Sequence, residues 1–288
     1  MDSNLVRRVG FAVIAIPLAL AIIWYGGLPL AFLLALTSVL AARELFDLAG
    51  RQGIRPARAL GFVSAAAVAP VTYVALVAPD VRDLVLAGWP YLVGIWVIVL
   101  LTWALAARAP AEKPLGAAGV TLLAVVYTGV LPAFLIGIRH LSHPERSWAG
   151  AWLVFFPLVV TWVCDTAAMF GGKALGGTKL APTISPGKTR SGAAAGVVGG
   201  LLMAPIFGTL VFPRVGLHIS LWQLLVLAGV LSIVGQIGDL AESLFKREAG
   251  VKDSSHLIPG HGGVLDRFDS LYFVIPVAAA MYDLFGVT

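Results

Sequence analysis

Residues 243–269 read SLFKREAGVKDSSHLIPGHGGVLDRFD, and long apolar runs lie on either side of this polar stretch. Acidic and basic residues are concentrated here, and glycines within PGHGG at 259–263 surround His261. A segment of this composition cannot form a packed core. Its backbone N–H groups and charged side chains can instead bind phosphates and a metal ion. We therefore expect the apolar runs to form a helical scaffold that holds this stretch.

The composition of the whole chain predicts a membrane protein. Its 288 residues are 59% hydrophobic and 12% charged, whereas soluble domains carry about 25% charged residues. Apolar runs of about 20 residues recur, long enough to cross a hydrocarbon core of about 30 Å as helices. We expect an all-α, polytopic transmembrane protein without a soluble domain. About nine spans are predicted, at residues 6–25, 28–49, 59–78, 84–106, 117–138, 149–171, 191–212, 220–245 and 269–287.

The predicted spans divide into two regions of different character. Spans one to five, within residues 1–148, contain few candidates for catalytic or ligand-binding residues. Residues 149–288 form the expected catalytic region, with substrate loops at 172–190 and 246–268. Span two ends with three charged residues for which an ion-paired helix end is expected and a functional role stays open: Arg43, Glu44 and Asp47.

The placement of Lys and Arg predicts the orientation in the membrane. With the N-terminus in the cytoplasm, sixteen of the 20 Lys and Arg residues fall on the cytoplasmic side, together with both substrate loops. We therefore expect a multi-pass protein of the cell membrane. The first apolar run is expected to remain as a span, because another apolar run follows it at once. The single cysteine, Cys164, excludes an intrachain disulfide.

The predicted sixth span contains an acidic residue and leads into a loop suited to anions. Asp165 lies within TWVCDTAAMFGG, where an unpaired carboxylate would cost several kcal/mol. Either a polar cavity or a hydrogen bond between helices is expected around it. Residues 171–192 read GGKALGGTKLAPTISPGKTRSG, rich in glycine, hydroxyls and lysine. This composition indicates an anion site or, alternatively, a basic loop that meets lipid headgroups.

A polar stripe is predicted at the end of span eight. Asp239, Glu242, Ser243 and Lys246 are spaced so that they share one face of a helix. Asp266 and Asp269 follow with a spacing of three at the entry to span nine. Convergence of Asp239, Asp266 and Asp269 beside basic residues predicts a Mg²⁺ site, because Mg²⁺ takes carboxylates together with substrate phosphates. Ion pairing with Arg267 is the alternative explanation for the last two acids.

Two other kinds of site are disfavoured. His256 and His261 have no nearby cysteine and lack the HExxH spacing of a zinc site. No GxSxG motif is present, which disfavours a membrane hydrolase.

The charged motifs of the C-terminal half resemble those of the phosphatidate cytidylyltransferases, also called CDP-diacylglycerol synthases. The strongest similarity lies in Ser243, Phe245-Lys246-Arg247, Lys252-Asp253, His261-Gly262-Gly263, Asp266-Arg267 and Asp269. A second similar set is Asp165-Thr166, Lys179-Leu180, Pro182, Ser185-Pro186 and Lys188-Thr189. The resemblance covers residues 160–275. This chain departs from the family pattern at Ala167–Met169, where Gly-Ala-Tyr is common, and at Arg190–Gly192, where Glu-Gly is common.

The resemblance implies a reaction in which CTP and phosphatidate give CDP-diacylglycerol and pyrophosphate. It implies Mg²⁺ as cofactor, with an additional monovalent cation left open, and the lipid bilayer as the environment. No nucleic-acid partner is expected, and a homodimer is left open. The implied metal ligands are Asp239, Asp266 and Asp269, with Asp165 as a further acid. The residues expected to bind phosphates or add donors are Ser185, Lys188, Thr189, Ser243, Lys246, Arg247, Lys252, His261, Gly262, Gly263 and Arg267.

Two other functions remain as alternatives. A CTP-dependent kinase of a polyprenol or similar lipid alcohol would need a base beside a neutral hydroxyl and would release CDP. An ion-coupled transporter would use Asp165 and Asp239 as an ion path. Many transporters contain an inverted repeat, but here the polar features crowd into the C-terminal half.

Overall fold

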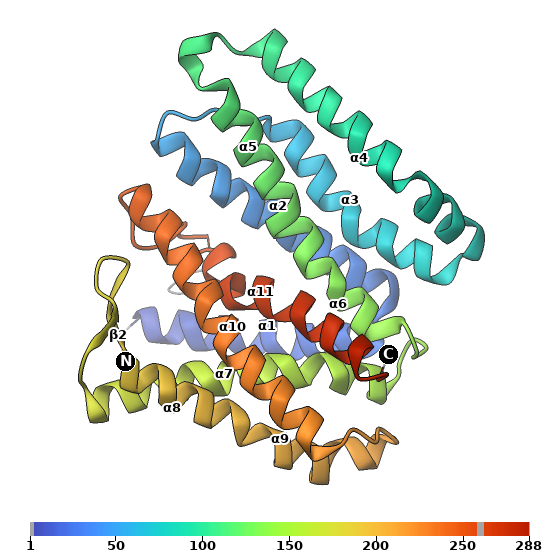
Figure 1. Ribbon diagram of the computed structural model, residues 1–288, viewed down its shortest axis with the longest axis vertical. Helices are drawn as coiled ribbons and strands as arrows, with labels where there is room; N and C mark the ends of the chain where they lie inside the picture. Colours follow the sequence, from blue (N-terminus) through green and yellow to red (C-terminus); the bar gives the residue numbers. More distant parts are fainter. Residues whose placement is uncertain (1–2, 258–261, 288) are drawn as a thin grey trace. The chain divides into compact units, whose positions relative to one another are not determined.

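A computed structural model describes residues 3–257 and 262–287 of the chain. Helices dominate it, and one short antiparallel hairpin is its sheet (Figure 1). By their contacts the residues form two compact units. Unit 1 comprises Met1–Ile22, Gly27–Gly137 and Ala249–Arg267, and unit 2 comprises Ile23–Gly26, Ile138–Glu248 and Phe268–Thr288. Three of the five boundaries between the units fall inside helices, namely α1 (Ser3–Tyr25), α6 (Leu131–His140) and α11 (Leu265–Leu284).

The membrane character of the fold is confirmed. Among the described residues, seven helical segments are long and apolar enough to cross a bilayer: Gly27–Arg51, Arg58–Val77, Pro79–Ala107, Pro110–His140, Trp148–Leu175, Arg190–Val215 and Leu221–Glu248. The predicted first and ninth spans are also helices, α1 (Ser3–Tyr25) and α11 (Leu265–Leu284). Helix α11 carries Asp266, Arg267 and Asp269 in its first two turns and is not among the seven. The count of nine spans therefore stays a prediction.

Unit 1 is built from antiparallel apolar helices. Its helices are α1 (Ser3–Tyr25) up to Ile22, α2 (Gly27–Arg51), α3 (Arg58–Val77), α4 (Pro79–Ala107), the short η1 (Pro110–Glu112), α5 (Pro114–Ala124), η2 (Val125–Val130) and α6 (Leu131–His140), whose last three residues belong to unit 2. Helix α3 packs against α2, α4 and η2. Gly129 of η2 lies so close to α3 that a Cβ atom there would sit 3.0 Å from the Cα of Ala65. A small residue at this contact lets the two backbones approach.

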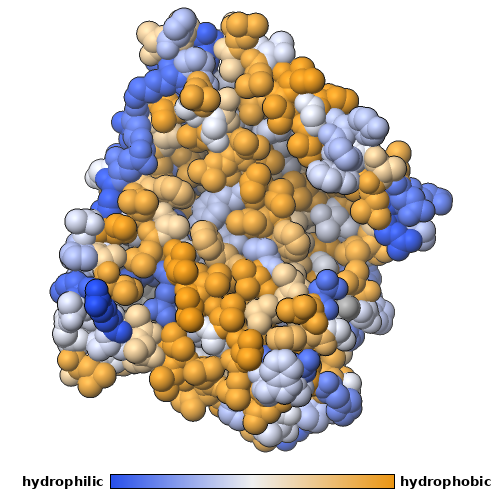
Figure 2. All heavy atoms as spheres, viewed as in Figure 1, coloured by the Kyte–Doolittle hydropathy of each residue, from blue (hydrophilic) through white to orange (hydrophobic). Residues whose placement is uncertain are grey.

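Much of the apolar surface faces outward, as expected for contact with lipid. Helix α4 exposes many large apolar side chains, among them Leu84, Trp89 and Leu105. Apolar residues also cover much of the face drawn in Figure 2. In water such a patch would promote aggregation, but in a bilayer it is the surface that contacts lipid.

Unit 2 contains the predicted substrate loop and the acids of spans six and eight. Its elements are α7 (Trp148–Leu175), β1 (Lys179–Ala181), β2 (Ser185–Thr189), α8 (Arg190–Leu201), α9 (Met203–Ile206), η3 (Phe207–Val211), η4 (Phe212–Val215), α10 (Leu221–Glu248) and most of α11. Helix α8 packs tightly on α7 because it presents glycines to it. A Cβ atom at Gly192 would lie 2.7 Å from the carbonyl oxygen of Ala168, and one at Gly199 would lie 2.5 Å from Ala167.

A buried arginine joins the end of α1 to the loop after α6, within unit 2. Arg139 is completely buried, and its Nε donates to the Ile23 carbonyl at 2.8 Å. Its Nη2 donates to the Trp24 carbonyl at 2.6 Å, and its Nη1 donates to the Pro144 carbonyl at 3.0 Å. The last carbonyls of a helix have no intrahelical partner, so Arg139 satisfies the C-terminus of α1.

Candidate active site

A cavity of about 540 Å³ lies within unit 2, lined by α7, the β1–β2 hairpin, α8 and α10. Its polar side chains come from all of these elements except α8: Asp165, Lys173, Lys179, Lys188, Thr189, Gln236 and Asp239. Three lysines and two aspartates therefore surround one space bounded by apolar helices. Of the two environments that the sequence left open for Asp165, the structure shows a cavity.

The predicted anion loop is more ordered than its composition indicated. Helix α7 continues to Leu175, and Gly176 and Gly177 then take positive φ angles of 60° and 96° that end it. Lys179 and Thr189 pair across the antiparallel strands β1 and β2. Thr189 also caps α8, since its hydroxyl accepts a hydrogen bond from the Gly192 N–H at 3.0 Å.

The hairpin carries Lys188 to an acid of α10. The Nζ atom of Lys188 lies 2.6 Å from Oδ2 of Asp239, and both side chains are largely buried. The charges of Lys188 and Asp239 also act on Asp165. The structure thus brings together Asp165, Lys188 and Asp239, which the sequence placed on three separate segments.

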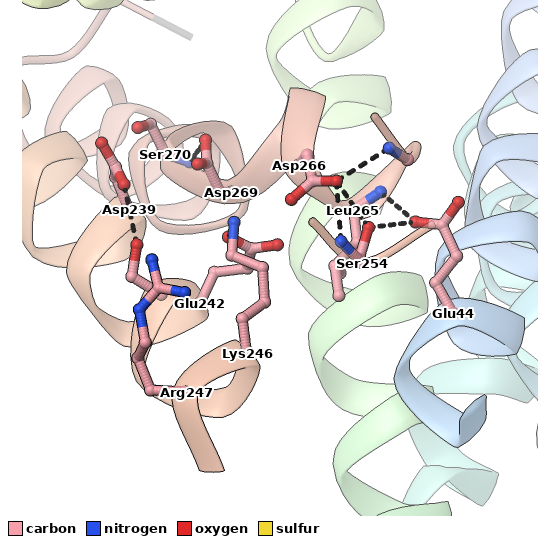
Figure 3. Close-up of polar contacts among 12 residues, drawn as sticks. Glu44, Asp239, Glu242, Lys246, Arg247, Ser254, Leu265, Asp266, Asp269 and Ser270 are labelled. Carbon is pink, nitrogen blue, oxygen red and sulfur yellow. Dashed lines mark hydrogen bonds and ion pairs between the residues drawn. The ribbon is translucent and has the colours of Figure 1, made fainter. Parts of the chain in front are cut away.

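The polar stripe predicted on α10 is confirmed. The Ser243 hydroxyl donates to Oδ1 of Asp239 at 3.4 Å, and Lys246 forms an ion pair with Glu242, whose side chain is fully buried (Figure 3). Both pairs are four residues apart, so they lie on one face of the helix. Arg247, one residue further along, donates its Nε–H to the Ile184 carbonyl at 3.0 Å. This bond ties α10 to the hairpin.

Asp269 lies beside Asp239 in unit 2 because glycines of α10 let α11 approach. A Cβ atom at Gly238 would meet the Asp269 carbonyl oxygen at 2.8 Å. The negative charge of Asp239 acts on the Asp269 carboxylate, and the positive charge of Lys246 partly offsets it. Oδ1 of Asp269 accepts the Ser270 N–H at 2.6 Å. Two of the predicted metal ligands, Asp239 and Asp269, therefore share one electrostatic environment.

Asp266, the third predicted ligand, has its hydrogen-bond partners in unit 1. Its Oδ2 accepts from the Gly263 N–H at 2.7 Å, and from the N–H and hydroxyl of Ser254 at 3.0 and 2.8 Å. Figure 3 shows Asp266 and Ser254 beside Glu44. Sequence analysis did not assign Glu44 to the site. Its only signal was an acidic residue near the end of an apolar span.

The remaining predicted residues lie in or directly beside the same two polar stretches. Lys252 and Arg267 are exposed, and Gly262 takes a positive φ of 81°. Ser185 begins β2. His261 lies outside the described residues.

The acids fit a cation that takes only some of its ligands from protein. Among residues 3–257 and 262–287, no group of three or more His, Cys, Asp or Glu side chains is placed to hold a metal ion alone. Mg²⁺ prefers one or two carboxylates and completes its shell with phosphates and water. The carboxylate oxygens of Asp239 and Asp269, in mutual repulsion, match that donor set.

Comparison with known protein families shows to which family this chain belongs. The sequence profile of the cytidylyltransferase family matches residues 6–285. The chain belongs to the cytidylyltransferase family. The match includes both units, so the resemblance seen in the C-terminal motifs extends to the N-terminal helices of this cytidylyltransferase family member.

Individual members of the cytidylyltransferase family support this assignment. The chain is 43% identical over 168 residues to a phosphatidate cytidylyltransferase of Bacillus subtilis, covering 58% of this chain and 59% of the relative. It is 42% identical over 156 residues to the enzyme of that name from Staphylococcus saprophyticus, covering 54% and 55%. For the Brucella suis protein the identity is 53% over 141 residues, covering 48% and 47%. The alignments thus span about half the length of these relatives.

Proposed function

We propose that this chain is a phosphatidate cytidylyltransferase, which transfers CMP from CTP to phosphatidate and releases pyrophosphate. The observation that carries the proposal is the cavity where Lys188 pairs with Asp239 beside Asp165, between apolar helices. A phosphate-binding cation and acids at the edge of membrane helices suit a reaction between a nucleotide and a lipid headgroup. The names of the relatives support the same chemistry.

The proposed reaction has a simple bond balance. A phosphate oxygen of phosphatidate attacks the α-phosphorus of CTP and forms a new P–O bond. The bond from the α-phosphorus to the oxygen bridging to the β-phosphate breaks, and its electron pair leaves with pyrophosphate. The lipid phosphate is already anionic, so no strong general base is needed. The main barrier is repulsion between two anions, which cations and donors aimed at the phosphates reduce.

In this proposal Lys188 binds a substrate phosphate after exchanging its contact with Asp239. Lys246, Arg247, Lys252 and Arg267 supply further positive charge, and Ser185, Thr189, Ser243 and the Gly262-Gly263 backbone supply donors. Lys246 is paired with Glu242 and Arg247 with the Ile184 carbonyl, so both side chains are held in place before substrate binds. His261 keeps its predicted phosphate-binding role.

Asp239 and Asp269, with Asp266 and Asp165 as further acids, are proposed to hold Mg²⁺. The ion would neutralise charge on the phosphates as pyrophosphate departs. An additional monovalent cation, which the sequence left open, fits the same acidic surroundings.

The first experiment follows label from α-labelled CTP into chloroform-extractable lipid. We expect incorporation by the purified protein that requires both phosphatidate and Mg²⁺, with equimolar release of pyrophosphate. No incorporation by folded protein would refute the proposal. Transfer from γ-labelled CTP to a lipid alcohol would then indicate the kinase, and ion flux in proteoliposomes would indicate the transporter.

We also propose that the N-terminus and the hairpin face the cytoplasm of a cell-membrane protein. Cys164 is buried, so introduced cysteines can be labelled over a low background. A membrane-impermeant maleimide applied to intact cells is expected to label Glu145→Cys, which lies in an exposed loop. Thr183→Cys, in the exposed hairpin turn, is expected to react only after permeabilisation. The opposite pattern would contradict this orientation.

We also propose that the protein forms a homodimer. Light scattering of the solubilised protein would measure the mass of the particle and test this.

A further inference from the structure

Glu44, on α2, is a buried carboxylate with four hydrogen-bond donors within reach in unit 1. Its side chain is 3% exposed. Oε1 accepts from the Ser255 hydroxyl at 2.7 Å and from the Val264 N–H at 3.0 Å. Oε2 accepts from the Leu265 N–H at 2.8 Å and lies 2.9 Å from the Ser254 hydroxyl. Glu44 therefore joins both ends of the polar segment, 254–257 and 262–266, to α2.

The second carboxylate of this network is Asp266. Ser254 stands within hydrogen-bond distance of Asp266 and of Glu44, but a hydroxyl has one proton to donate. The two acids therefore share that donor and are coupled through it. The network is also tightly packed around position 263. A Cβ atom at Gly263 would lie 2.2 Å from Oε2 of Glu44 and 2.1 Å from the Ser254 hydroxyl oxygen. The network admits only glycine at position 263.

The four donors around Glu44 need a carboxylate as their acceptor. A carboxylate has two acceptor oxygens and no proton, whereas an amide offers one oxygen and directs its NH₂ group at a donor. Four donors around one side chain thus require an acid. The Val264 and Leu265 N–H groups lie at the start of α11, where backbone N–H groups lack intrahelical partners and favour a negative charge.

We propose that Glu44 is a positioning residue of the cytidylyltransferase site. It fixes the start of α11, and thereby the carboxylate of Asp266, by tying the segments 254–257 and 262–266 to α2. This inference rests on the proposed function, because its catalytic consequence is turnover of CTP with phosphatidate. Glu44 itself touches no substrate, and its effect passes through Asp266 and the backbone of Gly263.

The test begins with hydrogen exchange of the whole protein in detergent. In Glu44→Gln, one amide oxygen cannot serve four donors, so amides in 254–257 and 262–266 are expected to exchange about tenfold faster or more. Peptides from α7 and α8 in unit 2 should keep their wild-type exchange. Ser255→Ala removes a single donor to Glu44, and a smaller acceleration in the same peptides is expected.

The matched control is Asp47→Asn on the same helix. Asp47 is partly exposed and pairs with Arg58 at 2.6 Å and with Arg43 at 3.9 Å. It makes no contact with the polar segment among the interactions of the described residues. We expect wild-type exchange in 254–257 and 262–266 for this variant, and turnover close to that of the wild type.

Turnover separates a positioning role from a merely structural one. Glu44→Gln is expected to lower kcat about tenfold or more, with the KM for CTP changed less. Glu44→Asp, which keeps the charge, should recover part of kcat. Equal kcat in Glu44→Gln and wild type would overturn the inference, as would equal losses in Gln and Asp variants that track falling thermal stability. If the wild type transfers no CMP, the proposed function fails, and the exchange data still show whether Glu44 holds the segment.

Discussion

Asp239→Asn is expected to reduce CMP transfer about a hundredfold or more, the largest loss of activity among the variants considered. Asparagine keeps the shape of the side chain but removes the charge that pairs with Lys188 at 2.6 Å and acts on Asp269. The measurement is the initial rate of label transfer from α-labelled CTP to lipid by purified variant, with phosphatidate and Mg²⁺ at saturation.

Two roles of Asp239 can be separated by titration. If Asp239 holds Mg²⁺, the variant needs a higher Mg²⁺ concentration for half-maximal rate, and Lys188→Met keeps the wild-type requirement. If Asp239 acts only by orienting Lys188, then Lys188→Met has the same defect and the double variant is no worse than either single one. The cycle therefore distinguishes a metal ligand from an ion-pair partner.

The control for Asp239→Asn is Glu248→Gln, which removes an exposed acid from the last turn of the same helix. Its rate should match that of the wild type. A folded Asp239→Asn protein with full activity would remove Asp239 from the catalytic site.

Hydropathy was enough to predict the helices but not their irregularities. Each predicted span corresponds to a helix because the cost of unsatisfied backbone groups in lipid leaves few alternatives. The π-helical turn at Val125–Val130 was not predicted. Gly129 within this turn lies against the backbone of Ala65, a tertiary contact that no local sequence pattern reveals. The β1–β2 hairpin was missed because its short strands, rich in lysine, proline and hydroxyls, show no alternating apolar pattern.

In the candidate site, too, some residues could be predicted from the sequence, whereas their contacts could not. Asp165 and Asp239 could be singled out from the sequence because an acid in an apolar span is costly without a partner. Their association with Lys188 could not, since it depends on how closely the glycines of α8 let it pack on α7. The role of Glu44 was still harder to predict from the sequence. Its partner Ser254 is 210 positions away in the chain, and no local pattern links a single acid in α2 to a distant loop.

The largest loss of stability is expected from Arg139→Met. Methionine fills much of the same volume but leaves the carbonyls of Ile23, Trp24 and Pro144 without their donor. At about 1–3 kcal/mol for each unsatisfied buried group, the total is about 3 kcal/mol or more. The apparent Tm in detergent, followed by the fluorescence of a thiol-reactive or intrinsic probe, should fall by about 6–12 °C.

Relaxation of the surroundings is restricted by close contacts. A Cβ atom at Gly26 would lie 3.1 Å from the Arg139 Cζ, and one at Gly150 would lie 2.5 Å from the Arg139 carbonyl oxygen. Backbone packed this closely cannot turn easily to find other donors. Arg139→Lys keeps the charge but not the planar fork that serves several carbonyls at once, so an intermediate Tm is expected.

Arg146→Met is the matched control, because Arg146 lies in the same loop but is exposed. It stacks on the Tyr25 ring at 4.8 Å and donates to the Tyr25 hydroxyl at 3.1 Å, and solvent weakens both contacts at this exposed position. If the two variants lost equal stability, general loss of positive charge in the loop would explain the effect. A clear excess for Arg139→Met would instead show that satisfying the carbonyls at the end of α1 is what stabilises this part of unit 2.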